Sequence, residues 1–150
     1  MQGRLLPKYN GRYQAHPVGY WQQEFEIASD IGLDSIEFIL DFNEANENPL
    51  LKSGGVDEIQ RVVKKTGVKV KTICADYFME APLHSIDTRV AEQSQQVMIR
   101  LLNNSLSLGI TDIVIPCVDQ SSLNNTEAVS YTHLRAHETV LDLVCRLLLE

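Results

Sequence analysis

Residues 32–38, Gly-Leu-Asp-Ser-Ile-Glu-Phe, decide the predicted fold, because the same arrangement recurs twice further along the chain. The other two copies are Gly-Val-Lys-Val-Lys-Thr-Ile at 67–73 and Gly-Ile-Thr-Asp-Ile-Val-Ile at 109–115. Each begins with a glycine, the residue that most readily ends a helix in a left-handed conformation. Each continues with aliphatic and β-branched residues, which favour strands. The pattern therefore predicts helix, glycine and strand three times in succession.

The segments before these glycines have the apolar spacing of amphipathic helices. Their apolar positions are Trp21, Phe25 and Ala28, then Val56, Ile59 and Val63, then Val90, Val97 and Leu101. Helix and strand alternating at intervals of 35 and 42 residues are typical of βα units around a parallel sheet. Residues 1–6 resemble the end of one more strand. We expect an α/β fold with about four parallel strands and three to four helices.

Composition places the chain among ordinary globular proteins. Of its 150 residues, 44% are hydrophobic and 22% charged, which is enough apolar material for a packed core. There is no run of apolar residues long enough for a membrane span or a signal peptide, so we expect a cytoplasmic protein that does not bind membranes. The formal charge of −7 argues against nucleic-acid binding, which requires clustered Lys and Arg.

We interpret the last 22 residues as having a different origin from the rest of the chain. Residues 129–139, Val-Ser-Tyr-Thr-His-Leu-Arg-Ala-His-Glu-Thr, match one reading frame of a common transposase sequencing adapter, and residues 143–150 resemble the other end of the same library molecule. We therefore treat 129–150 as a non-native, adapter-derived tail whose composition would still favour a helix. His133 and His137 have the spacing of zinc ligands on a helix, which on this interpretation is coincidental.

Candidate site residues are sought at the carboxyl ends of the strands, where parallel α/β proteins carry their chemistry. At the first strand, Gln2 and Arg4 are candidates, and the Arg4 guanidinium suits either a substrate oxyanion or a structural ion pair. Glu37 lies between Ile36 and Phe38 in the second strand, so its side chain points to the opposite face. A carboxylate there is costly unless it is paired or functional, and we expect it to line a pocket.

The later strands supply three further candidates. Asp76 and Asp119 directly follow strands and suit either the binding of substrate hydroxyls or the capping of a turn. Tyr77 begins a segment that either covers a sugar or seats the loop on the rim. Cys74 and Cys117 have no His partner at a recognisable spacing and are interpreted as small apolar fillers. His16 and His84 are expected to be solvated loop residues.

Several blocks in this order resemble a known family. They are MQGRL with Pro7, GRYQAHP at 11–17, GLDSIEFIL at 32–40, NPLL at 48–51, GVKVKTICADYFMEAPL at 67–83 and IVIPCVDQSSL at 113–123. Together they resemble the sugar-phosphate isomerases/epimerases, which are xylose-isomerase-like TIM barrels. A complete barrel needs roughly 250 residues. The resemblance thus implies that residues 1–128 form the N-terminal half of such a barrel.

The resemblance implies that the parent protein is a metal-dependent isomerase or epimerase. It would transfer a proton at the carbon next to a carbonyl, with an enediolate as the intermediate. The metal, manganese, zinc or magnesium, would be held by residues of later strands. The fragment itself is then expected to bind no metal and to be inactive, and Gln2, Arg4, Glu37, Asp76, Tyr77 and Asp119 are proposed only as substrate-binding residues. Two alternatives stay open. One is a non-catalytic half barrel that binds a sugar or a partner and self-associates through exposed strand edges; the other is an inosose dehydratase or endonuclease-like protein on the same fold.

Overall fold

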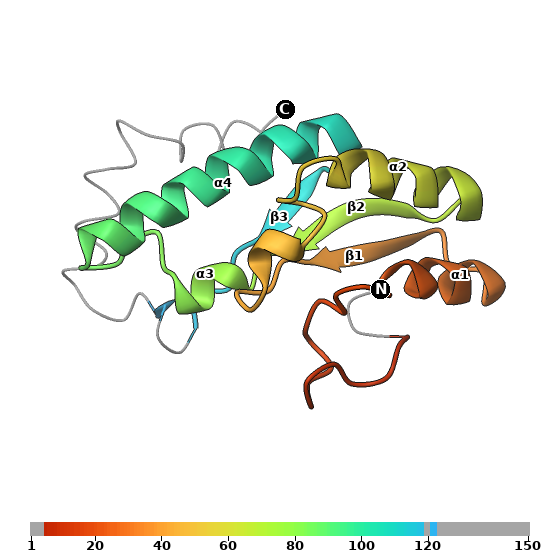
Figure 1. Cartoon of the computed structure of the whole chain (residues 1–150), viewed down its shortest axis with the longest axis horizontal. Coiled ribbons are helices and arrows are strands. Elements are labelled where there is room, and N and C mark those ends of the chain that lie inside the picture. The colour runs from red at the N-terminus through yellow and green to blue at the C-terminus, as the bar shows by residue number, and fades with distance from the viewer. Residues whose placement is uncertain (1–4, 119–120, 123–150) are drawn as a thin grey trace.

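The computed structural model describes residues 5–118, 121 and 122 (Figure 1). In chain order the elements are α1 (Gln22–Asp30), β1 (Ser35–Ile39), η1 (Ala45–Glu47), α2 (Gly55–Thr66), β2 (Lys69–Cys74), α3 (Tyr77–Glu80), α4 (Thr88–Leu108) and β3 (Asp112–Val114). This confirms an α/β fold, with a three-stranded parallel sheet and four α-helices in the described part of the chain.

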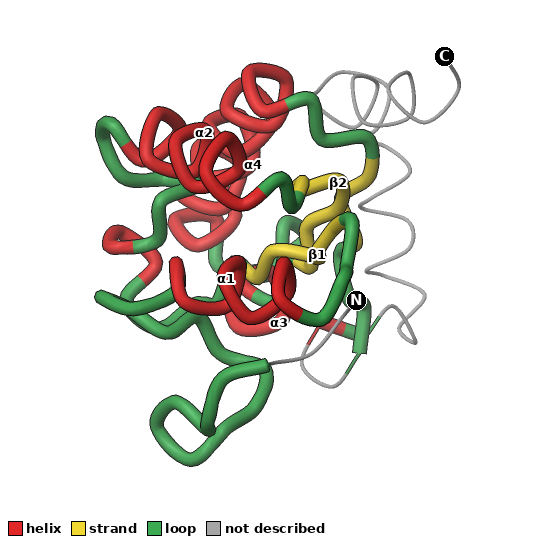
Figure 2. Tube along the Cα trace, turned by 90° about the vertical axis from the view of Figure 1, so that its right-hand side faces the viewer, coloured by secondary structure: helices red, strands yellow, loops and turns green. Residues whose placement is uncertain are grey.

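The strands lie in the order β1-β2-β3, which is also their order along the chain. Ile39 is in register with Cys74, and Cys74 is in register with Val114. The arrowheads of Figure 1 point toward one edge of the sheet, beside η1 and α3. In Figure 2, α1, α2 and α4 lie together on one side of the sheet. The βα repeat therefore places three consecutive strand ends side by side.

Glycines end the helices as the sequence predicts. Gly67 and Gly109 are the C-caps of α2 and α4, and both have left-handed backbone, with φ of 78° and 68°. Gly32, with φ of 78°, follows the C-cap of α1. A residue without Cβ adopts this conformation at no steric cost. The strand that follows each glycine begins within three residues, so these three turns set the positions of the strands.

The core lies between the sheet and the three long helices. Trp21 and Phe25 from α1 and its N-cap pack edge-to-face on each other, with ring centroids 5.7 Å apart, and Trp21 lies 5.5 Å from Phe38 of β1. Ile59 of α2, Ile73 of β2 and Leu101 of α4 are fully buried in the same cluster. Burying side chains of this size contributes about 1.5–3 kcal/mol each.

Two sequence predictions need correction. The buried face of α4 includes Ala91, Met98 and Leu102 together with the predicted Leu101, whereas the predicted Val90 and Val97 are half-buried and pack against the same core. In the predicted first strand, Leu5 and Leu6 form a bend, and residues 1–4 lie outside the described part. The three described strands form an open sheet, and no closed barrel is present among the described residues.

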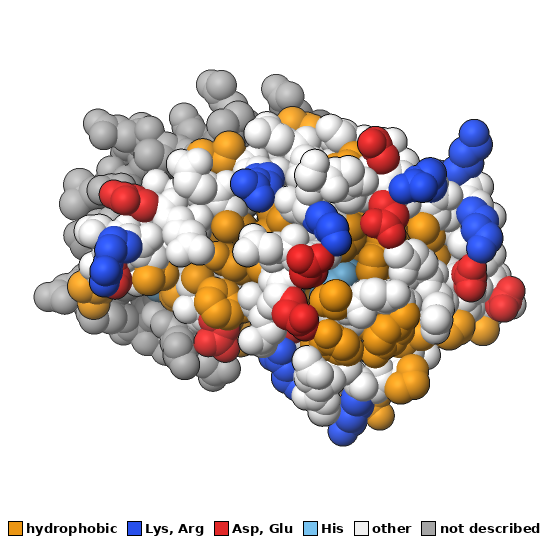
Figure 3. Space-filling model, viewed as in Figure 1, with side chains coloured by type: hydrophobic (Ala, Val, Ile, Leu, Met, Phe, Trp, Pro, Cys, Tyr) orange, Lys and Arg blue, Asp and Glu red, His pale blue; other side chains and the backbone are white. Residues whose placement is uncertain are grey.

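Charged side chains of both signs are mixed on the face seen in Figure 3, with Lys and Arg next to Asp and Glu. Three of the described ion pairs, Lys52–Glu47, Lys65–Glu26 and Arg89–Asp87, lie on the surface. Within the described part of the chain, the helices lack the combination of length and apolar character that crossing a bilayer requires.

Candidate functional site

The register of the sheet brings two aspartates together. Asp41 is two residues beyond Ile39, and Asp76 is two residues beyond Cys74, the partner of Ile39 in the neighbouring strand. Backbone hydrogen bonds continue past the strand ends, because the N–H of Leu40 donates to the carbonyl of Cys74 over 2.9 Å and the N–H of Tyr77 donates to the carbonyl of Leu40 over 2.9 Å. The two carboxylates therefore emerge at the same edge of the sheet.

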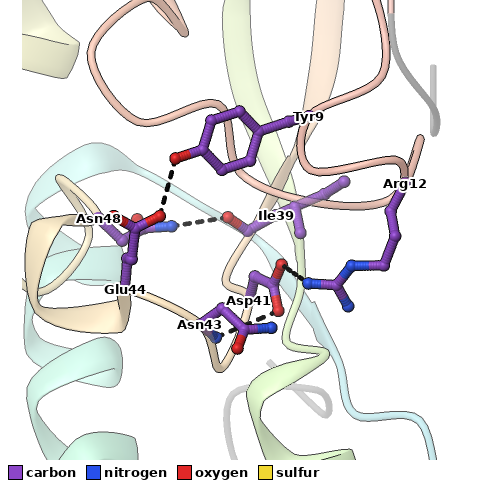
Figure 4. Close-up of polar contacts among 7 residues, drawn as sticks. All are labelled: Tyr9, Arg12, Ile39, Asp41, Asn43, Glu44 and Asn48. Carbon is purple, nitrogen blue, oxygen red and sulfur yellow. Dashed lines mark hydrogen bonds and ion pairs between the residues drawn. The ribbon is translucent and has the colours of Figure 1, made fainter.

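A tight turn brings an arginine to this edge. Asn10 and Gly11 both have positive φ, 48° and 77°, as the central residues of a type I′ hairpin turn require. The flanking Tyr9 and Arg12 exchange two backbone hydrogen bonds, of 2.9 and 3.0 Å. Two side chains then hold this turn against the loop after β1. Tyr9 Oη donates to Glu44 Oε2 over 2.7 Å, and Arg12 Nη2 donates to Asp41 Oδ2 over 2.8 Å (Figure 4).

Asp41 is a buried carboxylate, and both of its oxygens accept hydrogen bonds. Its side chain is only 8% exposed. Oδ2 accepts from Arg12, and Oδ1 accepts from the backbone N–H of Asn43 over 3.3 Å. A buried carboxylate is expensive unless its charge is compensated and its lone pairs are used. Arg12, whose side chain is 49% exposed, provides that compensation from the solvent side.

Asn48 holds the loop that carries Asp41. Its side chain is fully buried, donates from Nδ2 to the carbonyl of Ile39 over 2.8 Å, and accepts at Oδ1 from the N–H of Leu50 over 3.0 Å. Asn48 thus links the last residue of β1 to the segment that leads into α2. The loop between Asp41 and Gly55 is anchored at its middle as well as at its ends.

Asp76 has a different environment from Asp41. It is half-buried, and its Oδ1 accepts a hydrogen bond from the Cys74 thiol at 3.1 Å. Burial is the largest effect and raises the pKa of the Asp76 carboxyl above its ordinary value. The hydrogen bond from Cys74 lowers this pKa, the Asp41 charge raises it further, and the Arg12 charge lowers it. Among the described residues, no donor lies on its second oxygen, Oδ2. Asp76 can therefore accept a hydrogen bond from a ligand.

A pocket of about 430 Å³ opens over these groups. It is lined by Arg12, Tyr13, Gln14, Asp41, Asp76, Met79 and Glu80. The lining combines acceptors, the guanidinium and amide donors, and apolar surface from an aromatic ring and a thioether. A concave site with a few placed polar groups and apolar walls is the usual form of a small-molecule site. Its volume is at the low end for such sites.

The structure places the sequence-predicted candidates in three groups. Asp76 lines the pocket, as predicted for a residue at the end of a strand. Glu37 is half-buried in β1, and its side chain makes no hydrogen bond or ion pair with another described residue. Gln2, Arg4 and Asp119 lie outside the described residues, as do His133 and His137. The predicted pocket roles of Gln2, Arg4 and Asp119 are therefore untested, and Glu37 is not among the residues that line this pocket.

Tyr77 follows Asp76 in the chain but is not among the residues that line the pocket. It begins the four-residue helix α3, where the sequence predicted a loop, and it is only 4% exposed. Its ring packs 5.2 Å from that of Phe42 and 5.3 Å from that of Phe78, measured between centroids. Burial raises the pKa of its phenol. Of the two roles predicted for Tyr77, these contacts favour the one that seats the loop on the rim.

The histidine and cysteine predictions were partly wrong. His16, predicted to be solvated, is 5% exposed and packs between the rings of Trp21 and Phe38, with centroids 6.3 and 5.4 Å away. Its neighbours in 15–17 are buried as well, so this part of the N-terminal loop belongs to the core. His84 is half-buried, and burial lowers the pKa of its imidazole. Cys74 is buried as predicted, whereas Cys117 is exposed.

Sequence reasoning missed the ion pair that organises the pocket. The sequence analysis did not single out Asp41, and it included Arg12 only within the block GRYQAHP at 11–17. One local signal was available, since Asn10-Gly11 is the dipeptide most typical of a type I′ turn. It would have predicted that the chain reverses before Arg12. The position of Arg12 opposite Asp41 depends on tertiary contacts that no local pattern reports.

The donor set of the pocket does not fit a metal centre. Among residues 5–118, 121 and 122, no three His, Cys, Asp or Glu side chains lie close enough together to hold a metal ion. Asp41 is also already neutralised by Arg12. What the pocket groups can do is accept hydrogen bonds from hydroxyls, at Asp76, and donate to ligand oxygens, at Gln14. Comparison of the chain with protein-family models and with curated proteins gives no match.

Proposed function

We propose that the pocket at the carboxyl ends of β1 and β2 binds a sugar, and that residues 1–128 are the N-terminal half of a xylose-isomerase-like barrel. The observation that carries this proposal is the placement of Asp41 and Asp76, each two residues beyond strand residues that pair with each other, over a pocket of about 430 Å³. In parallel α/β folds this edge is where ligands bind.

The reaction proposed for the parent is isomerisation or epimerisation of a sugar or sugar phosphate, by transfer of a proton next to the carbonyl. The order of blocks from 11–17 to 113–123 supports the family resemblance, and the arrangement of sheet and helices is compatible with a larger barrel. Consecutive parallel strands with all long helices on one side leave the other side for the barrel interior.

In this proposal Asp41, Asp76 and Arg12 bind and orient the sugar. We assign them no metal, because the described carboxylates do not form a metal-binding group. The divalent metal that the family resemblance implies would be held by later strands. Asp76 accepts a hydrogen bond from a sugar hydroxyl, and Arg12 keeps the charge of Asp41 compensated beside it.

The test is made on the source gene. Amplifying it and reading past the codon for Glu127 supplies the sequence that follows residue 128. The extended protein, supplied with Mn²⁺ and D-fructose in D₂O, is expected to exchange the proton next to the ketose carbonyl, as followed by ¹H NMR. A native gene that encodes 129–150 as printed, or later strands without metal-binding carboxylates and histidine, would refute the proposal.

A further inference from the structure

We infer that this pocket accepts an uncharged, hydroxyl-bearing part of its ligand and excludes a phosphate group. The inference rests on the proposed sugar-binding function and specifies which end of the sugar faces β1 and β2. It is carried by the charges that line the pocket and by the fact that the Arg12 guanidinium is already committed to a buried partner.

The lining is acidic. Among the described residues, Asp41, Asp76 and Glu80 line the pocket with one cation, Arg12. Lys8 is close by in sequence, but its ammonium lies over the Tyr13 ring, 4.8 Å from the centroid, and it does not line the pocket. A phosphate dianion would thus enter beside more carboxylates than cations. Like charges brought together at a binding site reduce affinity strongly.

Arg12 cannot be recruited to a phosphate without cost. Its Nη2 donates to Asp41 Oδ2 over 2.8 Å, and the Asp41 side chain is only 8% exposed. If Arg12 turned toward a phosphate, Asp41 would be left as a buried carboxylate whose charge nothing else described compensates. Removing the partner of a buried charge is far more costly than breaking an exposed pair. The guanidinium therefore serves as the structural counter-ion of Asp41. It could bind a phosphate only by destabilising the loop after β1.

Hydroxyl groups suit the same lining. Asp76 Oδ2 has no donor among the described residues, so a ligand O–H can donate to it. Gln14, which is exposed at the rim, can both donate and accept. Tyr13 and Met79 offer apolar surface for the carbon chain of the ligand. This mixture of acceptors and apolar surface, without a free cation among the described lining residues, is complementary to the polyol part of a sugar.

The experiment compares two probes that differ only in a phosphate. The full 150-residue chain, labelled with ¹⁵N, is titrated with D-fructose and with D-fructose 6-phosphate at pH 7.5, and the shifts of the amides of Gly11, Tyr13 and Asp76 are followed. Inorganic phosphate is titrated separately. We expect saturable shifts with D-fructose and an affinity for the 6-phosphate that is lower by about tenfold or more.

Two variants test the cause of this preference. Asp76→Asn with Glu80→Gln removes two pocket charges and should bring the two affinities to within about threefold of each other, since most of the repulsion is gone. Asp34→Asn with Glu92→Gln removes two exposed charges away from the pocket and should leave the tenfold ratio in place.

Each result decides something. Equal or tighter binding of the 6-phosphate, or saturable binding of inorganic phosphate at Arg12, overturns the inference and leaves the proposed function standing. A ratio that the pocket variant does not change also overturns it, because charge would not be the cause. Absence of saturable shifts with both sugars overturns the proposed sugar pocket itself.

Discussion

The Arg12 guanidinium and the Asp41 carboxylate, 29 residues apart, meet over 2.8 Å at the carboxyl end of β1. The contact joins the N-terminal hairpin turn to the loop after the strand, and Tyr9 and Glu44 join the same two segments a short distance away. Because Asp41 is buried and Arg12 is half-exposed, the pair both compensates a costly charge and sets the wall of the pocket.

Arg12→Ala should lower the free energy of unfolding by about 1–3 kcal/mol, because Asp41 would keep a buried carboxylate without its charged donor. Urea unfolding followed by tryptophan fluorescence measures this, since Trp21 lies in the core beside β1. The matched control is Lys52→Ala, which removes an exposed pair of the same 2.8 Å length, with side chains 52% and 53% exposed. That change should cost no more than about 0.5 kcal/mol. Equal losses in the two variants would contradict the role given to burial.

Asn48→Ala should destabilise the chain by about 2–3 kcal/mol, because it leaves the Ile39 carbonyl and the Leu50 N–H without the partners they have now. Asn46→Ala, two residues earlier at an exposed position, is the control and should have little effect. Urea unfolding of both variants provides the comparison. A loss at Asn48 no larger than that at Asn46 would show that the loop after β1 does not depend on this anchor.

Gly55→Ala should be among the most damaging single changes in the chain. A Cβ at this position would come within 2.6 Å of the Pro49 Cα and still closer to the Pro49 carbonyl oxygen, and backbone atoms cannot move aside as side chains do. We expect a loss of about 3 kcal/mol or more, or failure to fold. Gly54→Ala has open space around it but a φ of +74°, so its cost should be limited to about 1 kcal/mol of backbone strain. Thermal unfolding of the two variants separates steric overlap from strain.

The helices and strands were predictable because their signals are local. Gly32, Gly67 and Gly109 each follow an amphipathic segment and precede a β-rich one, and the structure has a helix end and a strand start at all three. The predicted face of α4 was incomplete, since Ala91 and Met98 are less conspicuous in a sequence than Val90 and Val97, which pack at the margin of the core. In a long helix, small residues facing the sheet are selected by the space available, which periodicity alone does not report.

The site was only partly predictable. Asp76 follows its strand directly, so the general rule about strand ends found it. Asp41 follows β1 by the same rule, after the apolar residues Ile39 and Leu40, but it was not among the predicted candidates. Its importance comes from burial and from Arg12, and both depend on how the N-terminal turn packs on the sheet edge. His16 shows the same limit, because its burial follows from the aromatic rings around it.

Asp76→Asn should stabilise the chain at neutral pH, and the gain should disappear in acid. Burial raises the pKa of this carboxyl in the folded protein, so the folded state holds the proton more tightly than the unfolded state. Below the unfolded value, near 3.9, both states are protonated and Asp76 imposes no penalty. As the pH rises through the raised folded pKa, the ionised form weakens the folded state. Asn keeps an acceptor for the Cys74 thiol.

Urea unfolding of wild type and Asp76→Asn at several values between pH 3 and 8 measures this difference. Asp34→Asn, at an exposed position, shows what removal of one charge does without burial. A stability difference between wild type and Asp76→Asn that stays constant across this range would contradict the assignment of burial as the cause.

Saturation-transfer NMR on the full chain with D-fructose tests the central claim most directly, because it asks whether a sugar binds at the edge where Asp41 and Asp76 lie. We expect a signal with wild type that is lost when Asp41→Asn and Asp76→Asn are combined. It should remain in Asp57→Asn, which alters a second, more open hollow of about 450 Å³ between α2 and α4. Circular dichroism of each variant confirms that it is folded. A signal that persists in the folded double variant, or that only Asp57→Asn removes, would contradict the account.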